Sequence, residues 1–424
     1  MLTYGYGRNV NKNRGENNFN WSILFIISLT YIVTGIYREG FASLFPFLQK
    51  DFNLTRAQLG LYSTFFFFTS GLAAIFTGRL VDLKGSKWGL SFGVLFTGVF
   101  IILHAIAPNF VLLLVVATFT GFVFSIILPA ANKGIVEWFP QKWRNTALGI
   151  LSTAFPVGGM LGAILLPSLG SLIGWQKTIL FPGILALLCS LFISHFYKNK
   201  RKGEGNPKKN DVNNISFWKS FDQLIKNSDL ISVSTFGVFL GATSGSIAAH
   251  FTLFLHLDYS LTESIAGLGF AVVQFGSILG RPGWVLISDR LLGGDTRKTF
   301  LCIGFLFTSI SLIFALFLRY FNPSISILFL LAFLTGCSAR GWHGLFFASI
   351  TETVKEEHVG IAIGFSSLFI QSGMMLAPPI SGYIADLREA YDFSWLLLGL
   401  MMFLASVGQY LFYIKTQRKK QKIC

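Results

Sequence analysis

The sequence predicts an all-α membrane protein in which twelve transmembrane helices form two six-helix bundles. Of the 424 residues, 53% are hydrophobic and only 12% are charged, whereas roughly a quarter of the residues in an ordinary soluble protein are charged. The mean hydropathy is +0.61. The apolar residues form blocks of about 20 or more, the length that crosses the hydrocarbon core as a helix. One polar stretch, 198–228, divides these blocks into two sets.

The apolar blocks predict the helices in chain order. The first half, 21–197, carries spans at 21–47, 57–80, 86–106, 110–138, 145–170 and 174–197. The second half, 229–414, carries spans at 229–257, 262–287, 298–320, 325–354, 360–386 and 392–414. The stretch 198–228 is rich in Lys, Gly and Asn and contains Pro, which predicts a solvated linker. The polar segments 1–20 and 415–424 are expected to be tails.

The charge balance predicts the orientation of the chain. There are 34 Lys and Arg against 19 Asp and Glu, which gives a formal net charge of +15. Most of these cations fall in segments that are cytoplasmic if the N-terminus is inside, as the positive-inside rule requires. Both termini and the linker are therefore expected on the cytoplasmic side of a cell membrane, plasma or inner, beside anionic lipid headgroups. The charge then implies no nucleic-acid partner, and we expect a monomer in the lipid bilayer.

Cysteines and catalytic motifs give no enzyme or metal site. Cys189, Cys302 and Cys337 lie in apolar spans and Cys424 lies in the tail, so no disulfide framework is predicted. The chain contains no H-E-x-x-H, no G-x-S-x-G and no Cys/His cluster with metal-ligand spacing. We therefore predict no enzymatic activity, no cofactor and no metal. The first apolar block is too long for a cleaved signal peptide and is expected to remain as a span.

Two short loops share a pattern of glycine and charge. The loop after the second span reads Gly78-Arg-Leu-Val-Asp82-Leu-Lys-Gly85-Ser-Lys87. The loop after the eighth span runs from Gly280-Arg-Pro-Gly to Ser288-Asp289-Arg290. The first loop resembles the G-x-L-x-D-R-x-G-R-K signature of the major facilitator superfamily, with Leu83 in place of the usual Arg. The second is similar to the form found in the second half of that family, with Val285 where Gly is usual.

An internal repeat fits the same resemblance. A shift of 215 residues aligns Ala147, Gly149, Gly158, Met160 and Leu161 with Ala362, Gly364, Gly373, Met375 and Leu376. The match falls where a duplication of six helices places equivalent spans. The run Pro156-Val-Gly158-Gly159 resembles another element of the family. Over 21–415 the resemblance implies the major facilitator fold, with helices 1, 4, 7 and 10 around a central site and transport by alternating access.

The resemblance also implies a gating role for the two loops, which in the family brace the cytoplasmic side. Carboxylates at helix ends can meet Lys or Arg side chains and the positive end of a neighbouring helix dipole. The alternative is that each loop is a solvated turn. The residues expected to act in gating are Gly78, Asp82, Gly85, Asp289 and Arg290.

Polar side chains inside the spans are the candidates for substrate binding, because a charge near the bilayer centre costs about 2.5 to 3.5 kcal/mol on insertion scales. Several sets share a helix face at i, i+3, i+7 spacing. These sets are Tyr31, Thr34 and Arg38; Thr243, Ser246 and His250; Gln274, Ser277 and Arg281; and Arg340, His343 and Phe347. We predict a substrate site made of Tyr31, Thr34, Arg38, Asn132, His250, Gln274, Arg281, Arg340 and His343.

Arginines in the spans predict a small organic anion as substrate. The forked donors of Arg38 and Arg340 match a carboxylate or a phosphate, and carboxylate is the preferred interpretation. The pair Arg281-Pro282 looks like the Arg-Pro of monocarboxylate transporters, and relatives of the oxalate:formate antiporter likewise have an Arg on this helix. The alternatives are that Arg38 pairs internally with Glu39 or another helix, that Arg340 likewise has a structural role, and that Arg281 extends to the cytoplasmic surface.

Glu39, His250 and His343 are titratable groups near the expected site, so a secondary transporter coupled to protons is the leading mechanism. The alternative for each His is a hydrogen-bonded packing residue. Sodium coupling, anion exchange, and transport of a sugar phosphate or an inorganic anion stay open. A membrane sensor of the same fold that does not transport is the alternative from another function class.

Overall fold

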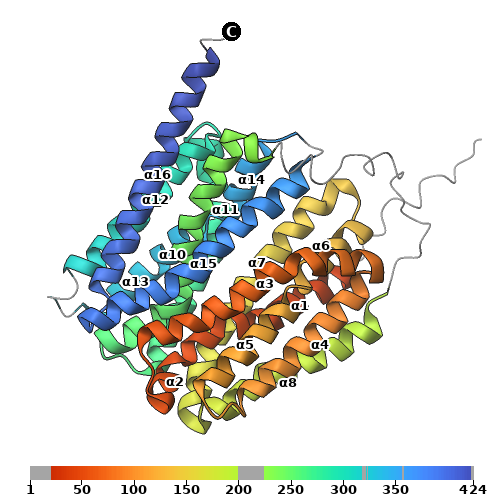
Figure 1. Ribbon diagram of the computed structural model, residues 1–424, viewed down its shortest axis with the longest axis vertical. Helices are drawn as coiled ribbons and strands as arrows, with labels where there is room; N and C mark the ends of the chain where they lie inside the picture. The colour runs from red at the N-terminus through yellow and green to blue at the C-terminus, as the bar shows by residue number, and fades with distance from the viewer. Residues whose placement is uncertain (1–20, 199–223, 318–320, 322, 356–357, 422–424) are drawn as a thin grey trace, which may run out of the picture.

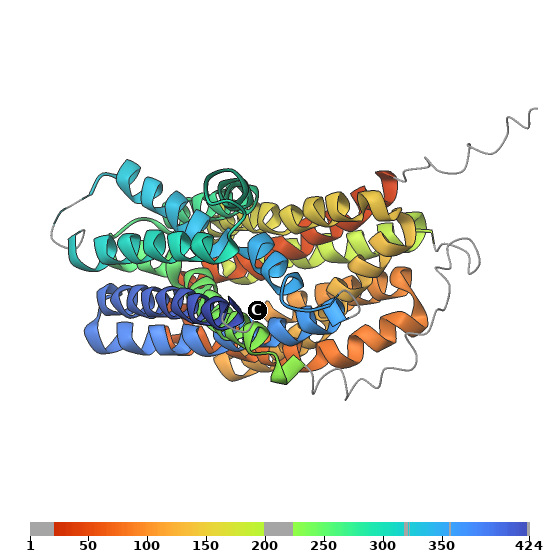
Figure 2. The same ribbon diagram turned by 90° about the horizontal axis from the view of Figure 1, so that it is seen from above.

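The computed structural model describes residues 21–198, 224–317, 321, 323–355 and 358–421. The described chain is helical, which confirms the predicted all-α class. Figure 1 shows two bundles side by side, one coloured red to yellow-green and the other green to blue. In Figure 2, which is turned by 90°, the helices of both bundles run roughly along one common direction. The predicted tail 1–20 and most of the predicted linker 198–228 lie outside the described residues.

The first bundle contains each of the six predicted spans of the first half. Its helices are α1 (Trp21–Gly40), α2 (Phe45–Phe52), α3 (Arg56–Lys84), α4 (Ser86–His104), α5 (Phe110–Phe124), α6 (Ile127–Trp138), α7 (Gln141–Ile173) and α8 (Trp175–Phe196). A 3-10 turn, η1 (Phe41–Leu44), joins α1 to α2. The first predicted span therefore covers three consecutive elements, and α5 and α6 together form the fourth.

The second bundle follows the same plan. Its elements are α10 (Ser228–Asp258), α11 (Glu263–Leu291), α12 (Thr296–Leu312), η3 (Ile313–Phe317), α13 (Ile325–Thr335), η4 (Gly336–Arg340), α14 (His343–Thr351), α15 (Val359–Arg388) and α16 (Asp392–Gln421). The elements η3 and η4 are π-helical turns. Helix α16 continues through most of the predicted tail 415–424, because Lys, Gln and Arg are good helix formers. Figure 1 shows its end projecting beyond the other helices.

Within the described residues, eleven helical segments are long and apolar enough to cross a membrane. Helix α3 bends by 52° between Ala74 and Phe76, and it makes a twelfth span if its two parts are counted together. The structure therefore holds eleven or twelve candidate spans against the twelve predicted. The cytoplasmic placement of the termini stays a prediction.

Two predicted spans, 110–138 and 325–354, are interrupted near the middle. Pro129 has no N–H to donate to the carbonyl of Ser125, four residues earlier, and α5 ends one residue before Ser125. The hydroxyl of Thr77 donates to this carbonyl instead, at 3.3 Å. In the other span, η4 inserts a π-turn between α13 and α14. π-Turns inside helices are frequent at functional sites, and Arg340 is the last residue of this one.

The two bundles touch along two seams. Helix α3 packs on α15 and α7 packs on α11, and close backbone approach requires glycine at several points. A Cβ atom at Gly60 would lie 2.6 Å from the carbonyl carbon of Pro378, and one at Gly267 would lie 2.6 Å from Pro167 Cγ. Following the predicted orientation, we call the end where α3 begins and α15 ends the outer end. The opposite end is the inner end.

Candidate functional site

The carboxylate of Glu39 lies where α1, α11 and η4 meet, and it is the centre of a buried polar cluster. The side chain is 4% exposed. Arg38 Nη1 donates to Oε1 at 2.7 Å, and Gln274 Nε2 donates to Oε2 at 3.1 Å. The guanidinium of Arg340 pairs with the same Oε2 atom. We call Arg38, Glu39, Gln274 and Arg340 the central cluster.

Glycines on neighbouring helices leave the space that the central cluster fills. A Cβ atom at Gly159 would lie 2.5 Å from Gln274 Nε2 and 2.6 Å from Glu39 Cβ. Gly280 lets α11 approach η4, since its Cβ would lie 2.9 Å from Cys337 Cα. The Pro156-Val-Gly158-Gly159 run of the sequence therefore contributes space to the cluster as well as helix packing.

Arg340 is held on several sides. Its Nη1 donates to the carbonyl oxygen of Ser244 on α10 at 3.0 Å, in addition to the ion pair with Glu39. The backbone carbonyl of Arg340 accepts a hydrogen bond from Ser277 at 3.1 Å and lies 3.1 Å from His343 Nδ1. Its Nε has no partner among the described residues. With 7% of its side chain exposed, Arg340 is the more rigidly fixed of the two cluster arginines.

Arg38 has more of its hydrogen-bonding capacity free. Within the described part of the chain, its side chain makes one hydrogen bond, to Glu39. A guanidinium has five N–H donors, and this side chain is 18% exposed. Its carbon Cζ lies 4.9 Å from the ring centres of both Phe67 and Phe155. Arg38 is therefore the cluster residue best able to bind a further acceptor.

Arg281 adds a third positive charge near the cluster. It is close enough to interact electrostatically with Arg340, Glu39 and Arg38, and its Nη1 donates to the carbonyl of Ser152 on α7 in the other half. Its Nε is buried and has no partner among the described residues. Two guanidinium groups thus pair with one carboxylate, and a third lies near enough to act on it electrostatically. A positive charge excess in a buried place favours an anionic ligand.

Several predicted substrate-binding residues lie around this cluster. The ring of Tyr31 packs edge-on against Phe155 at 5.9 Å, and its buried hydroxyl has no partner in the described chain. His343 stacks on Trp342 with ring centres 3.9 Å apart. The hydroxyl of Thr34 donates within its own helix to the carbonyl of Thr30 at 2.8 Å, which uses its donor.

The structure does not bring His250 and Asn132 into the central cluster. The Nε2 atom of His250 lies 2.8 Å from the carbonyl oxygen of Pro378, and its Nδ1 lies 3.2 Å from the hydroxyl of Tyr391. The ring therefore joins α10 to the outer part of α15, within the second half. Asn132 is exposed on α6.

The predicted gating residues lie at the inner end. Lys133 Nζ is 3.5 Å from the carboxylate of Asp82, in the same half, and the Asp82 side chain is 79% exposed. Gly85 ends α3 with φ of +93°, a conformation that favours glycine. A Cβ at Gly78 would meet no atom within 4 Å. Asp289 and Arg290 are exposed near the end of α11.

Sequence reasoning missed a contact between the halves at the outer end. The carboxylate of Asp386 accepts from the backbone N–H groups of Arg56 and Ala57 at 2.8 and 2.9 Å. The guanidinium of Arg56 donates to the carbonyl oxygens of Ala385 at 2.9 Å and Glu389 at 3.1 Å. We call these contacts the outer clasp. The sequence has an Asp near the end of one span and an Arg at the start of another. Nothing in the sequence indicates that these two residues meet.

A second missed group is a buried triad of titratable side chains in the first half. His104 Nε2 lies 2.9 Å from the hydroxyl of Tyr62 and 3.2 Å from that of Tyr37. His104 Nδ1 lies 2.7 Å from the carbonyl oxygen of Phe100. The triad therefore ties α1, α3 and α4 together. His104 lies near the end of the predicted span 86–106, where the sequence gives no sign of its two tyrosine partners.

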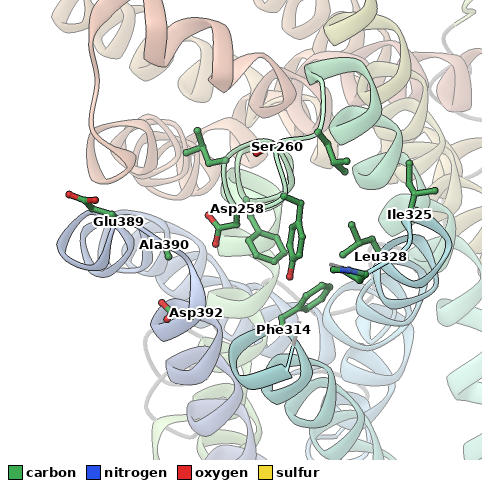
Figure 3. A pocket seen from close by; sticks show the side chains of 13 residues that line it. Asp258, Ser260, Phe314, Ile325, Leu328, Glu389, Ala390 and Asp392 are labelled. Atoms are coloured by element: carbon green, nitrogen blue, oxygen red, sulfur yellow. The ribbon is translucent and has the colours of Figure 1, made fainter. Parts of the chain in front are cut away.

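A cavity of about 590 Å³ opens at the outer end of the second half. Figure 3 shows the carboxylates of Asp258, Glu389 and Asp392 around it, with Phe314 and Leu328 among the apolar side chains. None of the predicted substrate-binding residues lines this cavity. It is therefore separate from the central cluster.

Two helical bundles that span a membrane and meet at a buried cluster of charge define a class of multi-pass transport proteins. The chain belongs to the Major Facilitator Superfamily, whose family profile matches residues 27–259 and 230–423. It is similar to the hexuronate transporter of Bacillus subtilis (strain 168), with 22% identity over 416 residues, 91% of this chain and 93% of that protein. The membrane sensor protein UhpC of Escherichia coli (strain K12) is 22% identical over 373 residues, 84% of this chain and 83% of the sensor.

Solved structures share this fold. A bacterial homolog of the human lysosomal transporter Spinster, in an inward-facing and unoccupied conformation, superposes with a TM-score of 0.79. The two sequences are 17% identical, and the match covers 94% of this chain and 97% of that one. This likeness supports the arrangement of the helices.

Proposed function

We propose that the protein is a secondary active transporter that moves a small organic anion, a carboxylate, across the cell membrane by alternating access. The observation that carries the proposal is the buried charge where the halves meet. Arg38 from the first half and Arg340 from the second pair with the carboxylate of Glu39, and Arg281 of the second half adds a third positive charge nearby. In this proposal both termini are cytoplasmic and the protein acts as a monomer.

An anion completes the charge balance of this place. Buried charges are costly unless they are paired and hydrogen-bonded, and Arg38 keeps N–H donors beyond the one that it gives to Glu39. Guanidinium donors match a carboxylate in a bidentate manner. The hexuronate transporter of B. subtilis and the galacturonate transporter of Dickeya chrysanthemi, which is 25% identical over 185 residues, support a carboxylate cargo.

Glu39 supports coupling to protons. Its carboxylate pairs with Arg38 and Arg340 at the same time, so it competes with an anionic substrate for both guanidinium groups. Protonation of Glu39 would release them, and the substrate carboxylate would replace it as the acceptor. One proton would then travel with the anion. Proton symport is therefore the mechanism that we propose.

Counterflow in proteoliposomes tests the transport proposal. Vesicles loaded with unlabelled galacturonate, a hexose phosphate or inorganic phosphate are diluted into the labelled compound, and we expect accumulation of the carboxylate. The Arg38→Gln variant should lose this counterflow, whereas Lys177→Gln, at an exposed outer position, should keep it. Proton symport would be excluded if neither an imposed pH gradient nor a proton uncoupler changed the uptake.

The similarity to a membrane sensor supports a second candidate function. A sensor of this fold would bind its anion at the same cluster without moving it. A ligand that binds the native state raises its thermal stability, so the same compounds are tested in a thermal-shift assay. Stabilisation by an anion that shows no counterflow would favour the sensor over the transporter.

A further inference from the structure

The guanidinium of Arg38 is enclosed by three phenylalanine rings from three helices of the first half. Its carbon Cζ lies 4.9 Å from the ring centre of Phe67 on α3, 5.9 Å from that of Phe124 on α5 and 4.9 Å from that of Phe155 on α7. All three distances are within the range of a cation–π contact. We call Phe67, Phe124 and Phe155 the phenylalanine box.

The rings of the box are fixed by their own packing. Phe155 contacts Phe124 edge-on at 6.3 Å and the ring of Tyr31 at 5.9 Å. Edge-to-face pairs at such distances are favourable. The backbone that carries Phe155 is also fixed, because α7 packs tightly on α1: a Cβ at Gly158 would clash with the carbonyl group of Ile32. The box therefore has a defined position relative to Arg38.

The box attracts the guanidinium without using its N–H donors. A phenylalanine ring attracts the cation through its π-face and offers no acceptor that would occupy an N–H group. One N–H of Arg38 is used by Glu39, and the side chain keeps 18% exposure. The N–H edge is the part that recognises a planar carboxylate. Lysine, with a round ammonium group, would lack this edge.

We propose that Phe67, Phe124 and Phe155 are positioning residues that aim the N–H edge of Arg38 at the carboxylate of the substrate. The proposal rests on the proposed function, since it assigns these rings to the same anion site. Losing one ring leaves Arg38 charged but less well oriented. The substrate affinity should then fall while the rate of the conformational cycle stays close to that of the unmodified protein.

The first experiment needs no substrate. Arginines of the purified protein are modified with phenylglyoxal, and the rate at Arg38 is followed by mass spectrometry, with the exposed Arg290 as internal reference. We expect Phe155→Leu and Phe67→Leu to raise the rate at Arg38 about three- to thirtyfold, the range that a cation–π contact corresponds to. Phe155→Tyr keeps an aromatic ring, so the modification rate at Arg38 should stay as slow as in the unmodified protein. The control is Phe119→Leu, on α5 but 52% exposed and stacked on Phe100.

The second experiment measures counterflow of galacturonate. Phe155→Leu and Phe67→Leu should raise the half-saturating concentration about three- to thirtyfold with less than a twofold change in the maximal rate. Phe155→Tyr should leave the half-saturating concentration at the value of the unmodified protein. In the Arg38→Lys background, Phe155→Leu should have a smaller effect, because the edge that the ring aims is already absent.

The two experiments separate the possible failures. If the unmodified protein neither binds nor moves galacturonate, the carboxylate proposal fails, and the phenylglyoxal rates still decide whether the box holds Arg38. An unchanged rate at Arg38 in both leucine variants would overturn the box. Raised rates with an unchanged half-saturating concentration would show that the rings hold Arg38 for a structural reason only, which also overturns the proposal.

Discussion

The two ends of the molecule use charge differently. At the outer end, the carboxylate of Asp386 caps the start of α3 and the guanidinium of Arg56 caps the end of α15, so the contacts cross between the halves. At the inner end, the described ion pair of Asp82 is with Lys133 of its own half. Helix ends have unpaired N–H or C=O groups that such side chains satisfy. In this conformation the caps that join the halves lie at the outer end, and toward the inner end Arg281 adds one hydrogen bond between the halves, to the carbonyl of Ser152.

In alternating access the two ends of the molecule open in turn. The family resemblance implies that the inner loops brace the protein, and such a brace belongs to a conformation in which the halves close at the inner end. The described conformation has its clasp at the other end. Opening toward the outside must break the outer clasp, so its residues should control the balance between the two conformations.

The largest expected effect comes from Asp386→Ala, which removes the acceptor of two backbone N–H groups. Removing a capping side chain costs about 0.5 to 2 kcal/mol, and Asp386 also pairs with Arg56 at 3.8 Å. The outer-closed conformation should therefore lose about 2 kcal/mol, roughly a thirtyfold change in population ratio. Spin labels at Lys50→Cys on α2 and Leu257→Cys on α10 report the change, because α2 and α10 touch between the halves. Native cysteines are replaced in this background.

We expect a longer distance component between the labels in Asp386→Ala. Asp386→Asn keeps one oxygen acceptor and should show a smaller component. A distance distribution identical to that of the unmodified protein would mean that the outer clasp does not decide which conformation is populated.

The sequence predicted the spans and most of the central cluster for one physical reason. Arg38, Glu39, Gln274 and Arg340 are polar in apolar blocks, and lipid penalises such groups unless they face the protein interior. The ion pair between Glu39 and Arg340 joins positions 301 apart in the chain, and no local pattern specifies that distance.

A shared helix face does not by itself predict which residues form the site. The spacing of His250 placed it on one face of its span, but which neighbour meets this face depends on packing. The structure directs the ring to Pro378 and Tyr391 of its own half. The phenylalanine box left no signal either, because Phe67, Phe124 and Phe155 are apolar residues in apolar blocks.

Two glycines that differ in what surrounds them test the closed seam. At Gly60 an added Cβ would lie 2.6 Å from the backbone of Pro378 in the other half, whereas at Gly149 on α7 it would meet nothing within 4 Å. Overpacking typically costs 1 to 3 kcal/mol, so Gly60→Ala should shift the equilibrium toward outer opening by about 1 to 2 kcal/mol, the lower part of this range for a single methyl group. Gly149→Ala is the control and should leave the spin-label distances unchanged, because its new methyl group touches no second helix. Equal behaviour of the two variants would contradict the closed seam at the outer end.

The smallest effect is expected at the inner end, where two variants separate an ion pair from a helix cap. The ion pair of Asp82 with Lys133 is largely exposed, and such pairs contribute about 0 to 1 kcal/mol. Lys133 Nζ also donates to the carbonyl oxygens of Val81 and Asp82 at 2.9 Å, which satisfies the end of α3 independently of the carboxylate.

In thermal unfolding of the detergent-solubilised protein, Asp82→Asn should therefore lower the midpoint by less than Lys133→Met does. The small Asp82 effect should vanish at high salt, because exposed charges are screened. A larger loss for Asp82→Asn than for Lys133→Met would show that the carboxylate already braces the inner end in this conformation, and the contrast between the two ends would no longer hold.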